Sequence, residues 1–275
     1  MAVFTDLDRR VCEPPFDKAG YDARRPVCDD VASKMPIVHV TGYKRLFKYI
    51  FINDPHEIPP TDGSHSLSSG TRKAEDLLGF KRSVYFYAGR AHRKFGNVAL
   101  AFFACCEENH TGSATPFDSG GLVHPRRFIK LKLDSDDESR LVQYGKESVL
   151  SLSEWRTVFG KILAAYFDNV IDYWKGKPNP HDPEGLYELN DEWRAWTFEV
   201  RFYEGQSIFD RAAWCTDEPL WNRLRRDHDG QETKPPGDPP TALDRFMEGP
   251  GLIIAPGSAT FCDEVERWVR KEVGL

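Results

Sequence analysis

Short stretches of the chain alternate apolar and polar residues, or are apolar throughout, and these patterns predict β-strands. One strand begins at Ile37, because Pro36 can open a strand but cannot lie inside one. The nearly continuous apolar run Val98–Cys105 predicts a strand in the middle of a sheet. The other predicted strands are Val84–Tyr87, Phe128–Leu133, Thr197–Glu204 and Leu252–Ala255.

Apolar residues that recur every three or four positions predict helices. The clearest begins at Ser151, where Ser151-Leu-Ser-Glu154 has the pattern of a capping box, and its apolar stripe continues to Gly176. Other helices are predicted over Lys44–Ile52, Thr71–Leu78 and Thr260–Val273. Segments rich in Pro, Gly, Ser or charge predict loops over Asp54–Gly70, Glu107–Gly121, Lys177–Asp182 and Arg223–Pro240.

Strands and helices do not alternate regularly along the chain, which favours an α+β fold over a doubly wound sheet. Residues 1–35 are polar, include Pro14-Pro15, and predict an irregular arm. Residues 36–275 are then expected to form one α+β catalytic domain with a helical insertion around 151–176.

Composition narrows the classes of protein to which the chain could belong. The chain has 40% hydrophobic and 13% aromatic residues, ample for a packed core, and no apolar run near 18 residues that could span a membrane. The N-terminal sequence does not have the pattern of a signal peptide, so we expect a cytoplasmic protein without membrane partners. The 6 cysteines include no C-x-x-C pair, and no metal site is expected. A net charge of −6 encodes no general attraction for nucleic acid.

Three separate segments place polar side chains among apolar ones: Pro36–Gly42, Ser83–Arg90 and Trp196–Arg201. A carboxylate can stabilise an oxocarbenium-like sugar cation, and the planar fork of an arginine can donate two hydrogen bonds to a pyrophosphate. A histidine or threonine can hold a ribose, and aromatic rings can stack on nicotinamide. The segments therefore predict a site for NAD made from His39, Thr41, Tyr85, Tyr87, Arg90 and Glu199.

The same segments resemble the DarT-type ADP-ribosyltransferases. Val38-His39-Val40-Thr41, followed by Leu46 and Ile50, is similar to the opening strand and helix of that family. Tyr85-Phe86-Tyr87-Ala88-Gly89-Arg90-Ala91 resembles its aromatic strand that ends in an arginine. Glu199, in Phe-Glu-Val-Arg, is similar to its late-strand catalytic glutamate.

The resemblance implies an ADP-ribosyltransferase-like fold of mixed sheets with flanking helices. It also implies a glycosyltransferase that uses NAD as co-substrate and modifies a nucleic acid or a protein, as a toxin or defence effector. Five residues would bind NAD: His39, Thr41, Tyr85, Tyr87 and Arg90. Arg90 and Glu199 would be the catalytic residues. Arg90, His39 and Glu199 are expected to line one groove, although they are remote in the sequence.

Other interpretations remain open at this stage. Glu199 and Arg201 share a strand face and could form a solvated ion pair. Cys105 or Cys106, with His110 or His124 and the nearby Asp118, could build a thiol-dependent hydrolase. The loop Thr111–Gly121 could form an anion-binding nest or be a plain connector. A non-catalytic binding module is a third possibility.

Overall fold

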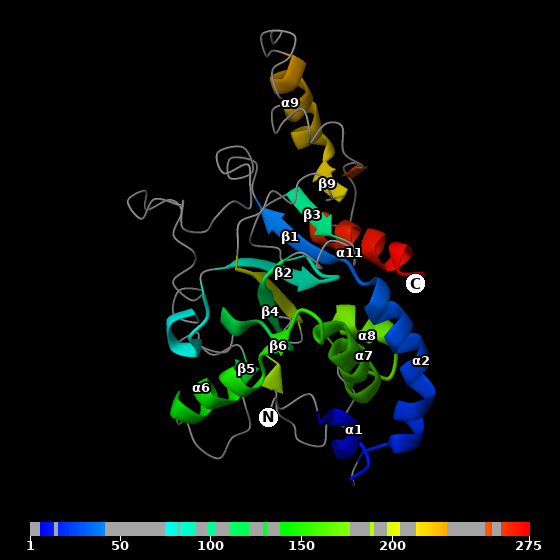
Figure 1. The fold of residues 1–275 in the computed structure, drawn as a ribbon. Helices are drawn as coiled ribbons and strands as arrows, with labels where there is room; N and C mark the ends of the chain where they lie inside the picture. Colours follow the sequence, from blue (N-terminus) through cyan, green and yellow to red (C-terminus); the bar gives the residue numbers. More distant parts are fainter. Residues whose placement is uncertain are drawn as a thin grey trace.

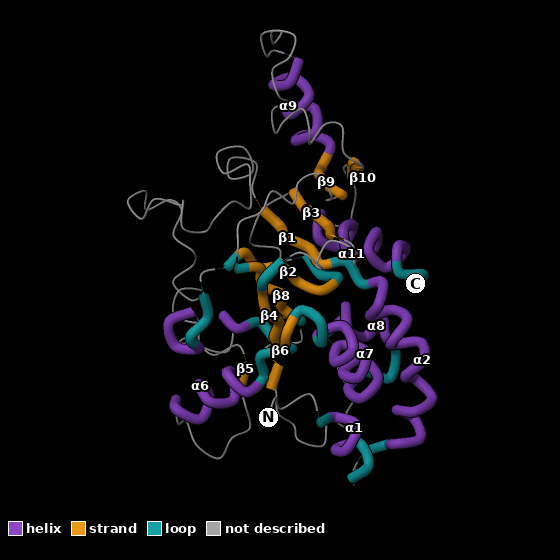
Figure 2. Tube along the Cα trace, in the orientation of Figure 1, coloured by secondary structure: helices purple, strands orange, loops and turns teal. Residues whose placement is uncertain are grey.

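A computed structural model describes the greater part of the chain: residues 6–13, 16–41, 75–81, 83–91, 98–102, 110–120, 129–130, 138–176, 188–189, 197–203, 213–229, 251–254 and 260–275. These residues form a mixed α+β structure built around a sheet whose strand order is β10-β9-β3-β1-β2-β8-β4-β6 (Figures 1 and 2). Neighbours in this order are antiparallel except β9 and β10, which are parallel.

The strands of the sheet bring together segments from most of the chain. Their bounds are β1 Ile37–Thr41, β2 Val84–Ala88, β3 Val98–Phe102, β4 Gly112–Thr115, β6 Leu150–Ser151, β8 Glu199–Phe202, β9 Ala213–Asp217 and β10 Gly251–Ile254. A separate antiparallel pair is formed by β5 Ile129–Lys130 and β7 Glu188–Leu189. The prediction that residues from Val98 form an interior strand is confirmed, since β3 lies between β1 and β9.

Helices flank the sheet, and in Figure 2 α2, α7 and α8 lie together beside it while α9 stands away from the other helices. Their bounds are α1 Leu7–Arg10, α2 Lys18–Lys34, α6 Glu138–Glu147, α7 Trp155–Tyr166, α8 Val170–Lys175, α9 Glu218–Asp229 and α11 Phe261–Glu272. No helix in the described ranges is both long enough and apolar enough to cross a bilayer.

Strand register gives the two faces of the sheet different chemistry. Paired residues of antiparallel strands point to the same face, and successive residues point to opposite faces. Phe86 pairs with Val200 and shares its face with Phe198 and Phe202, whereas Tyr87 pairs with Glu199 on the other face. We call these the apolar face and the polar face.

The apolar face forms the core with α7. Phe198, just before β8, packs against the rings of Trp155 and Phe159, with centroids 5.6 and 5.1 Å apart. Trp155, Phe159 and Phe198 are almost fully buried. Burial of this much aromatic surface stabilises the contact between sheet and helix layer, because each such ring removes a large apolar area from water.

The prediction of irregular structure within residues 1–35 is wrong over α2, which is a helix of 17 residues. Its buried side chains, Tyr21, Cys28, Val31 and Ala32, lie on one face, and α2 packs along α7. Arg24 Nε donates to the carbonyl oxygen of Ala164 in α7 at 2.9 Å. Helix packing therefore outweighs Pro26, which removes one backbone donor from the middle of α2.

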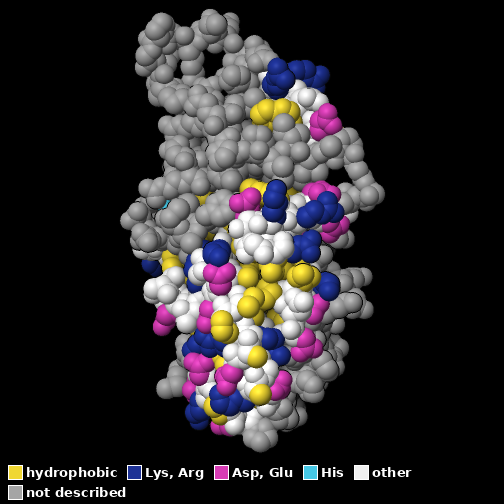
Figure 3. All heavy atoms as spheres, turned by 90° about the vertical axis from the view of Figure 1, so that its right-hand side faces the viewer, with side chains coloured by type: hydrophobic (Ala, Val, Ile, Leu, Met, Phe, Trp, Pro, Cys, Tyr) yellow, Lys and Arg dark blue, Asp and Glu magenta, His cyan; other side chains and the backbone are white. Residues whose placement is uncertain are grey.

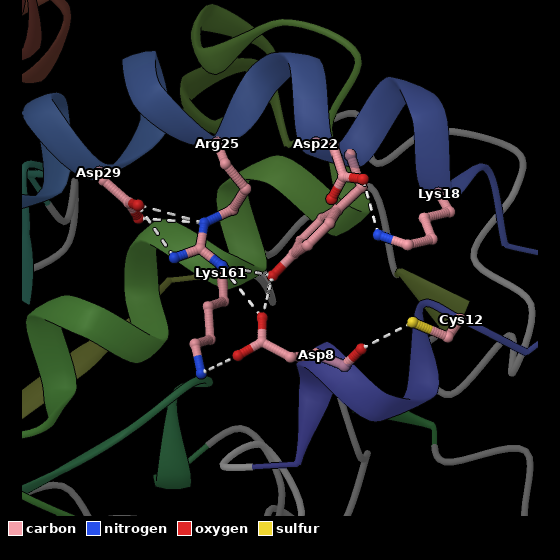
Figure 4. A network of polar contacts seen from close by, with 8 residues as sticks. Asp8, Cys12, Lys18, Asp22, Arg25, Asp29 and Lys161 are labelled. Carbon is pink, nitrogen blue, oxygen red and sulfur yellow. Dashed lines mark hydrogen bonds and ion pairs between the residues drawn. The ribbon is translucent and has the colours of Figure 1, made fainter.

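A polar network fixes α1 against α2 and α7 (Figure 4). The Asp8 carboxylate accepts hydrogen bonds from Tyr21 Oη at 2.7 Å and Arg25 Nη1 at 3.0 Å, and it lies 2.6 Å from Lys161 Nζ. Arg25 also donates to Asp29 one helical turn further on. The N-terminal segment is thus part of the folded domain.

The helical insertion around 151–176 is divided into α7 and α8, since the chain is extended at Phe167 and Asn169. The capping box is only half formed. The backbone N–H of Ser151 does donate to Glu154, but the serine hydroxyl also donates to that carboxylate instead of accepting from the helix amides. Ser151 lies in β6, and α7 begins at Trp155.

Two predicted loops contain regular structure. Gly112–Thr115, inside the loop predicted over 107–121, forms β4, and α9 extends six residues past Arg223 into the loop predicted over 223–240. The predicted helix 44–52 lies outside the described residues. The predicted terminal helix is confirmed as α11, with Thr260 as its N-cap.

Acidic and basic side chains are mixed over the face shown in Figure 3, which is the right-hand side of Figure 1. On the described part of this face neither sign of charge dominates. The described part of this face therefore presents no concentration of charge of one sign.

Candidate functional site

Polar side chains gather on the polar face of the sheet, where β2, β8 and β4 lie side by side. Register brings them together: Tyr87 and Thr115 flank Glu199, while Tyr85 and Ser113 flank Arg201. We call these six residues of the three strands the polar cluster: Tyr85, Tyr87, Ser113, Thr115, Glu199 and Arg201.

An ion pair lies at the centre of the polar cluster. Arg201 Nη1 is 2.7 Å from Glu199 Oε1, and the two side chains are 0% and 2% exposed. Glu199 and Arg201 do form an ion pair, but the expectation that this pair is solvated is wrong, because both side chains are buried. A buried pair is tolerated only when its remaining donors are also satisfied, because both charges have left water.

The guanidinium of Arg201 meets that condition. Its Nε and Nη2 donate to Ser113 Oγ at 3.2 and 3.1 Å, and Nη1 donates to Thr115 Oγ1 at 3.3 Å. Its central carbon lies 3.8 Å from the ring centroid of Phe80, a cation–π contact. Arg201 is thereby fixed in one position against Glu199.

The carboxyl group of Glu199 also contacts the segment that follows β4. Ser119 Oγ donates to Glu199 Oε1 at 2.7 Å. Burial raises the pKa of Glu199 to about 7, although Arg201 and hydrogen bonds from Ser119 oppose this rise; the nearby charge of Asp118 adds to it. A carboxyl group with this pKa can both hold and release a proton near neutral pH.

Two tyrosine hydroxyls lie beside the ion pair. Tyr85 Oη donates to Glu75 Oε1 at 2.8 Å, and Tyr87 Oη donates to Asp118 Oδ2 at 3.5 Å. Burial and the surrounding carboxylates raise the pKa of both tyrosines well above the ordinary value. Both hydroxyls therefore stay protonated at neutral pH and act as hydrogen-bond donors.

The polar cluster reaches the surface along one border. Asp118 and Tyr203 are half-buried, and Lys81 is exposed. Tyr203 Oη donates to Ser113 Oγ at 2.6 Å, and Lys81 Nζ lies 5.7 Å from the Tyr203 ring centroid. A molecule that approaches Glu199 along this border would meet hydroxyl groups, a carboxylate and a lysine.

His39 lies on the apolar face, not with Glu199. Val38 pairs with Tyr87, so the next residue along β1 points to the opposite face. His39 Nδ1 donates to the Tyr85 carbonyl oxygen at 2.9 Å, and its ring lies 5.6 Å from that of Phe86. Thr41 is the last residue of β1 and pairs with Val98.

Arg90 also lies away from the polar cluster. Its Nη2 donates to the Trp174 carbonyl oxygen at 3.2 Å, and its guanidinium lies 5.3 Å from the ring of Tyr173, both in α8. Its Nε is 3.7 Å from Glu266 Oε1 in α11. The Tyr173 ring packs on Phe159 of α7, which places Arg90 with the helices of the apolar face.

The predicted groove that joins Arg90, His39 and Glu199 is therefore wrong. The structure brings together Tyr85, Tyr87 and Glu199 from the predicted set and separates His39 and Arg90 from them. Strand alternation contained this information for His39, which falls on the face of Phe86 once the pairing of β1 with β2 is known. Arg90 lies beyond the end of β2, after Gly89 with its φ of 64°, so its position depends on its contacts with α8 and α11.

The thiol-based alternative gains no support from the described residues. Cys105, Cys106 and His124 lie outside them, and His110 stacks on Phe202 of the apolar face with ring centroids 4.5 Å apart. Among the described side chains, no group of His, Cys, Asp and Glu could hold a metal ion.

Sequence reasoning missed Arg201 and Glu75 as site residues. It singled out the loop Thr111–Gly121 as a possible anion-binding nest but did not place its residues beside Glu199; they are Ser113, Thr115, Asp118 and Ser119. The alternation Gly112-Ser113-Ala114-Thr115 was a usable signal for β4. Gly112 is required there, because a Cβ at that position would meet the carbonyl oxygen of Arg201 on the neighbouring strand.

No family model matches the chain, and no curated protein matches it either.

Proposed function

We propose that the protein is an NAD-dependent ADP-ribosyltransferase whose reacting carboxyl group is Glu199. The observation that carries this proposal is the environment of Glu199: a buried carboxyl group, held by Arg201 and Ser119, with a pKa of about 7. Titratable groups with such perturbed pKa values are concentrated at functional sites. The resemblance of the three strand segments to DarT-type enzymes supports NAD as the donor.

In this reaction the bond between nicotinamide and ribose breaks, and its electron pair leaves with nicotinamide. As this bond breaks, the ribose carries positive charge in the transition state, and an ionised Glu199 stabilises that charge because a fixed charge in a buried site needs no reorganisation. Arg201 is a positioning residue that orients this carboxylate. Tyr85 and Tyr87 supply hydroxyl donors and aromatic surface beside it.

The donor-binding part of the hypothesis changes with the structure. Arg90 is bound to α8 and α11, so it does not serve as the pyrophosphate ligand in this proposal. Lys81 takes its place, because it is an exposed cation at the border of the polar cluster. His39 and Thr41 are assigned no contact with NAD.

The test is release of nicotinamide from NAD by the protein and by Glu199→Gln. We expect turnover to fall about 100-fold or more, because the amide cannot neutralise the sugar cation, while the Kd for NAD changes little. Turnover by the parent should rise between pH 6 and pH 8 as Glu199 ionises. Glu272→Gln, at an exposed position of α11, is the matched control. Equal turnover by the parent and Glu199→Gln would refute the assignment.

The acceptor is a nucleic acid or a protein. Incubation of the protein with labelled NAD and a cell lysate, followed by separate nuclease and protease digestion, identifies the polymer that carries the label. The Glu199→Gln variant in the same lysate shows the labelling that other enzymes contribute.

A further inference from the structure

Asp118 lies in the short segment that follows β4, and residues on both sides of it are held by hydrogen bonds or ring contacts. On one side, Thr115 Oγ1 donates to the Phe117 carbonyl oxygen at 2.9 Å, and the buried Phe117 ring stacks on Tyr144 of α6 at 5.9 Å. On the other side, Ser119 binds Glu199. Asp118 is therefore positioned by anchored residues before and after it.

The carboxylate of Asp118 points to the same part of the site as Glu199. Tyr87, whose register partner is Glu199, places its hydroxyl 3.5 Å from Asp118 Oδ2. Asp118 is half-buried, whereas Glu199 is almost fully buried. The site thus holds two carboxyl groups in different surroundings, one in the interior and one at the border with solvent.

Two carboxyl groups in unlike environments can divide a reaction between them. The buried one suits a fixed role beside the sugar, because water is excluded there. The one at the border can meet an incoming acceptor and can return a proton to solvent afterwards. This division rests on the proposed function.

We infer that Asp118 is the general base that activates the acceptor in the transfer reaction. Its carboxylate takes the proton from the acceptor O–H or N–H as that atom bonds to the anomeric carbon of the ribose. The bond to nicotinamide breaks in the same displacement, and nicotinamide leaves with the electron pair. Asp118 then releases the proton to water, so that charge and atoms balance.

The experiment measures nicotinamide release from NAD with water as acceptor, for the parent, Asp118→Asn and Glu199→Gln. General-base catalysis contributes roughly 100-fold or more, so we expect kcat of Asp118→Asn to fall by about that factor. The Kd for NAD should stay within about twofold, since the base acts on the acceptor. Asp118→Glu should retain part of the activity because it keeps the carboxylate.

Azide separates a general base from a structural role. It is an anion that attacks without losing a proton, so it should restore turnover and yield the glycosyl azide with Asp118→Asn but not with Glu199→Gln. Asp76→Asn, an exposed position close to Glu75, is the matched control and should behave as the parent.

The outcomes are distinct. Parent-like hydrolysis by Asp118→Asn, or a defect that azide does not relieve in a variant that melts like the parent, overturns the role of Asp118 alone. Absence of nicotinamide release by the parent overturns the proposed function, and the role of Asp118 with it. Rescue by azide that is specific to Asp118→Asn supports both.

Discussion

Substitution of Glu199 by glutamine tests the electrostatics of the polar cluster without any ligand. Glu199 has an ordinary pKa of 4.5 that burial raises to about 7 in the folded protein. Each pKa unit corresponds to about 1.4 kcal/mol, so the shift is equivalent to about 3 kcal/mol of folding free energy. The group is buried, so solvent does not screen this effect.

The sign of the change in stability with pH follows from the number of protons that each state binds. Between pH 4.5 and pH 7 the folded state holds the Glu199 proton and the unfolded state releases it, so a rise in pH favours unfolding. The contribution is complete below the unfolded pKa and is lost as pH rises through the folded pKa. Glutamine does not titrate, so the free energy of unfolding of Glu199→Gln lacks this pH-dependent contribution.

Urea unfolding of the parent and Glu199→Gln at a series of pH values measures the effect. The free energy of unfolding of the parent, minus that of the variant, should fall by about 3 kcal/mol between pH 4 and pH 8. Glu272→Gln controls for the replacement of a carboxylate by an amide at an exposed position. A difference that stays constant or rises with pH would refute the reasoning, because it would mean that attraction to Arg201 outweighs burial.

Two further predictions concern the stability of the fold outside the polar cluster. Asp8→Asn should lower the free energy of unfolding by about 1 kcal/mol at pH 7, since this carboxylate is partly exposed and screened. Burial by itself would raise the pKa of Asp8, but hydrogen bonds from Lys161 and Tyr21 outweigh it, so the net pKa is lowered. The difference in free energy of unfolding between the parent and Asp8→Asn should therefore shrink as pH falls through the folded pKa, as measured by urea titration. Gly89→Ala should cost about 3 kcal/mol, because φ is 64° and the new Cβ would meet Met35 Sδ. Gly79→Ala, with φ of 70° and open space, should cost only about 1 kcal/mol in the same denaturation assay, and equal losses would contradict the role given to packing.

The sequence by itself determined where β1, β2, β3, β8 and β10 lie and which of their residues share a face, but it did not predict β4 or β9. Alternation in Phe-Glu-Val-Arg-Phe placed Glu199 and Arg201 together on one side of β8, and the structure confirms this. The strand that begins at Ile37 and the helix that follows Thr260 were also predicted from local patterns. Side-chain period and capping residues are local properties, so they need no knowledge of neighbours.

Helix α2 shows that local sequence patterns alone did not predict every helix. Pro26 and the many charges suggested an irregular arm, but Tyr21, Cys28 and Val31 fall on one helical face and pack on α7. Ion pairs one turn apart, such as Lys18 with Asp22, add support. The helix exists because tertiary packing supplies stability that its own composition does not.

Only the tertiary structure decided which polar residues meet. The order β2-β8-β4 brings Tyr87, Glu199 and Thr115 side by side from three distant parts of the chain. It also buries the Glu199–Arg201 pair, which the sequence alone would leave solvated. Strand order and register are non-local choices, and they fix both the partners and the dielectric surroundings of each charge.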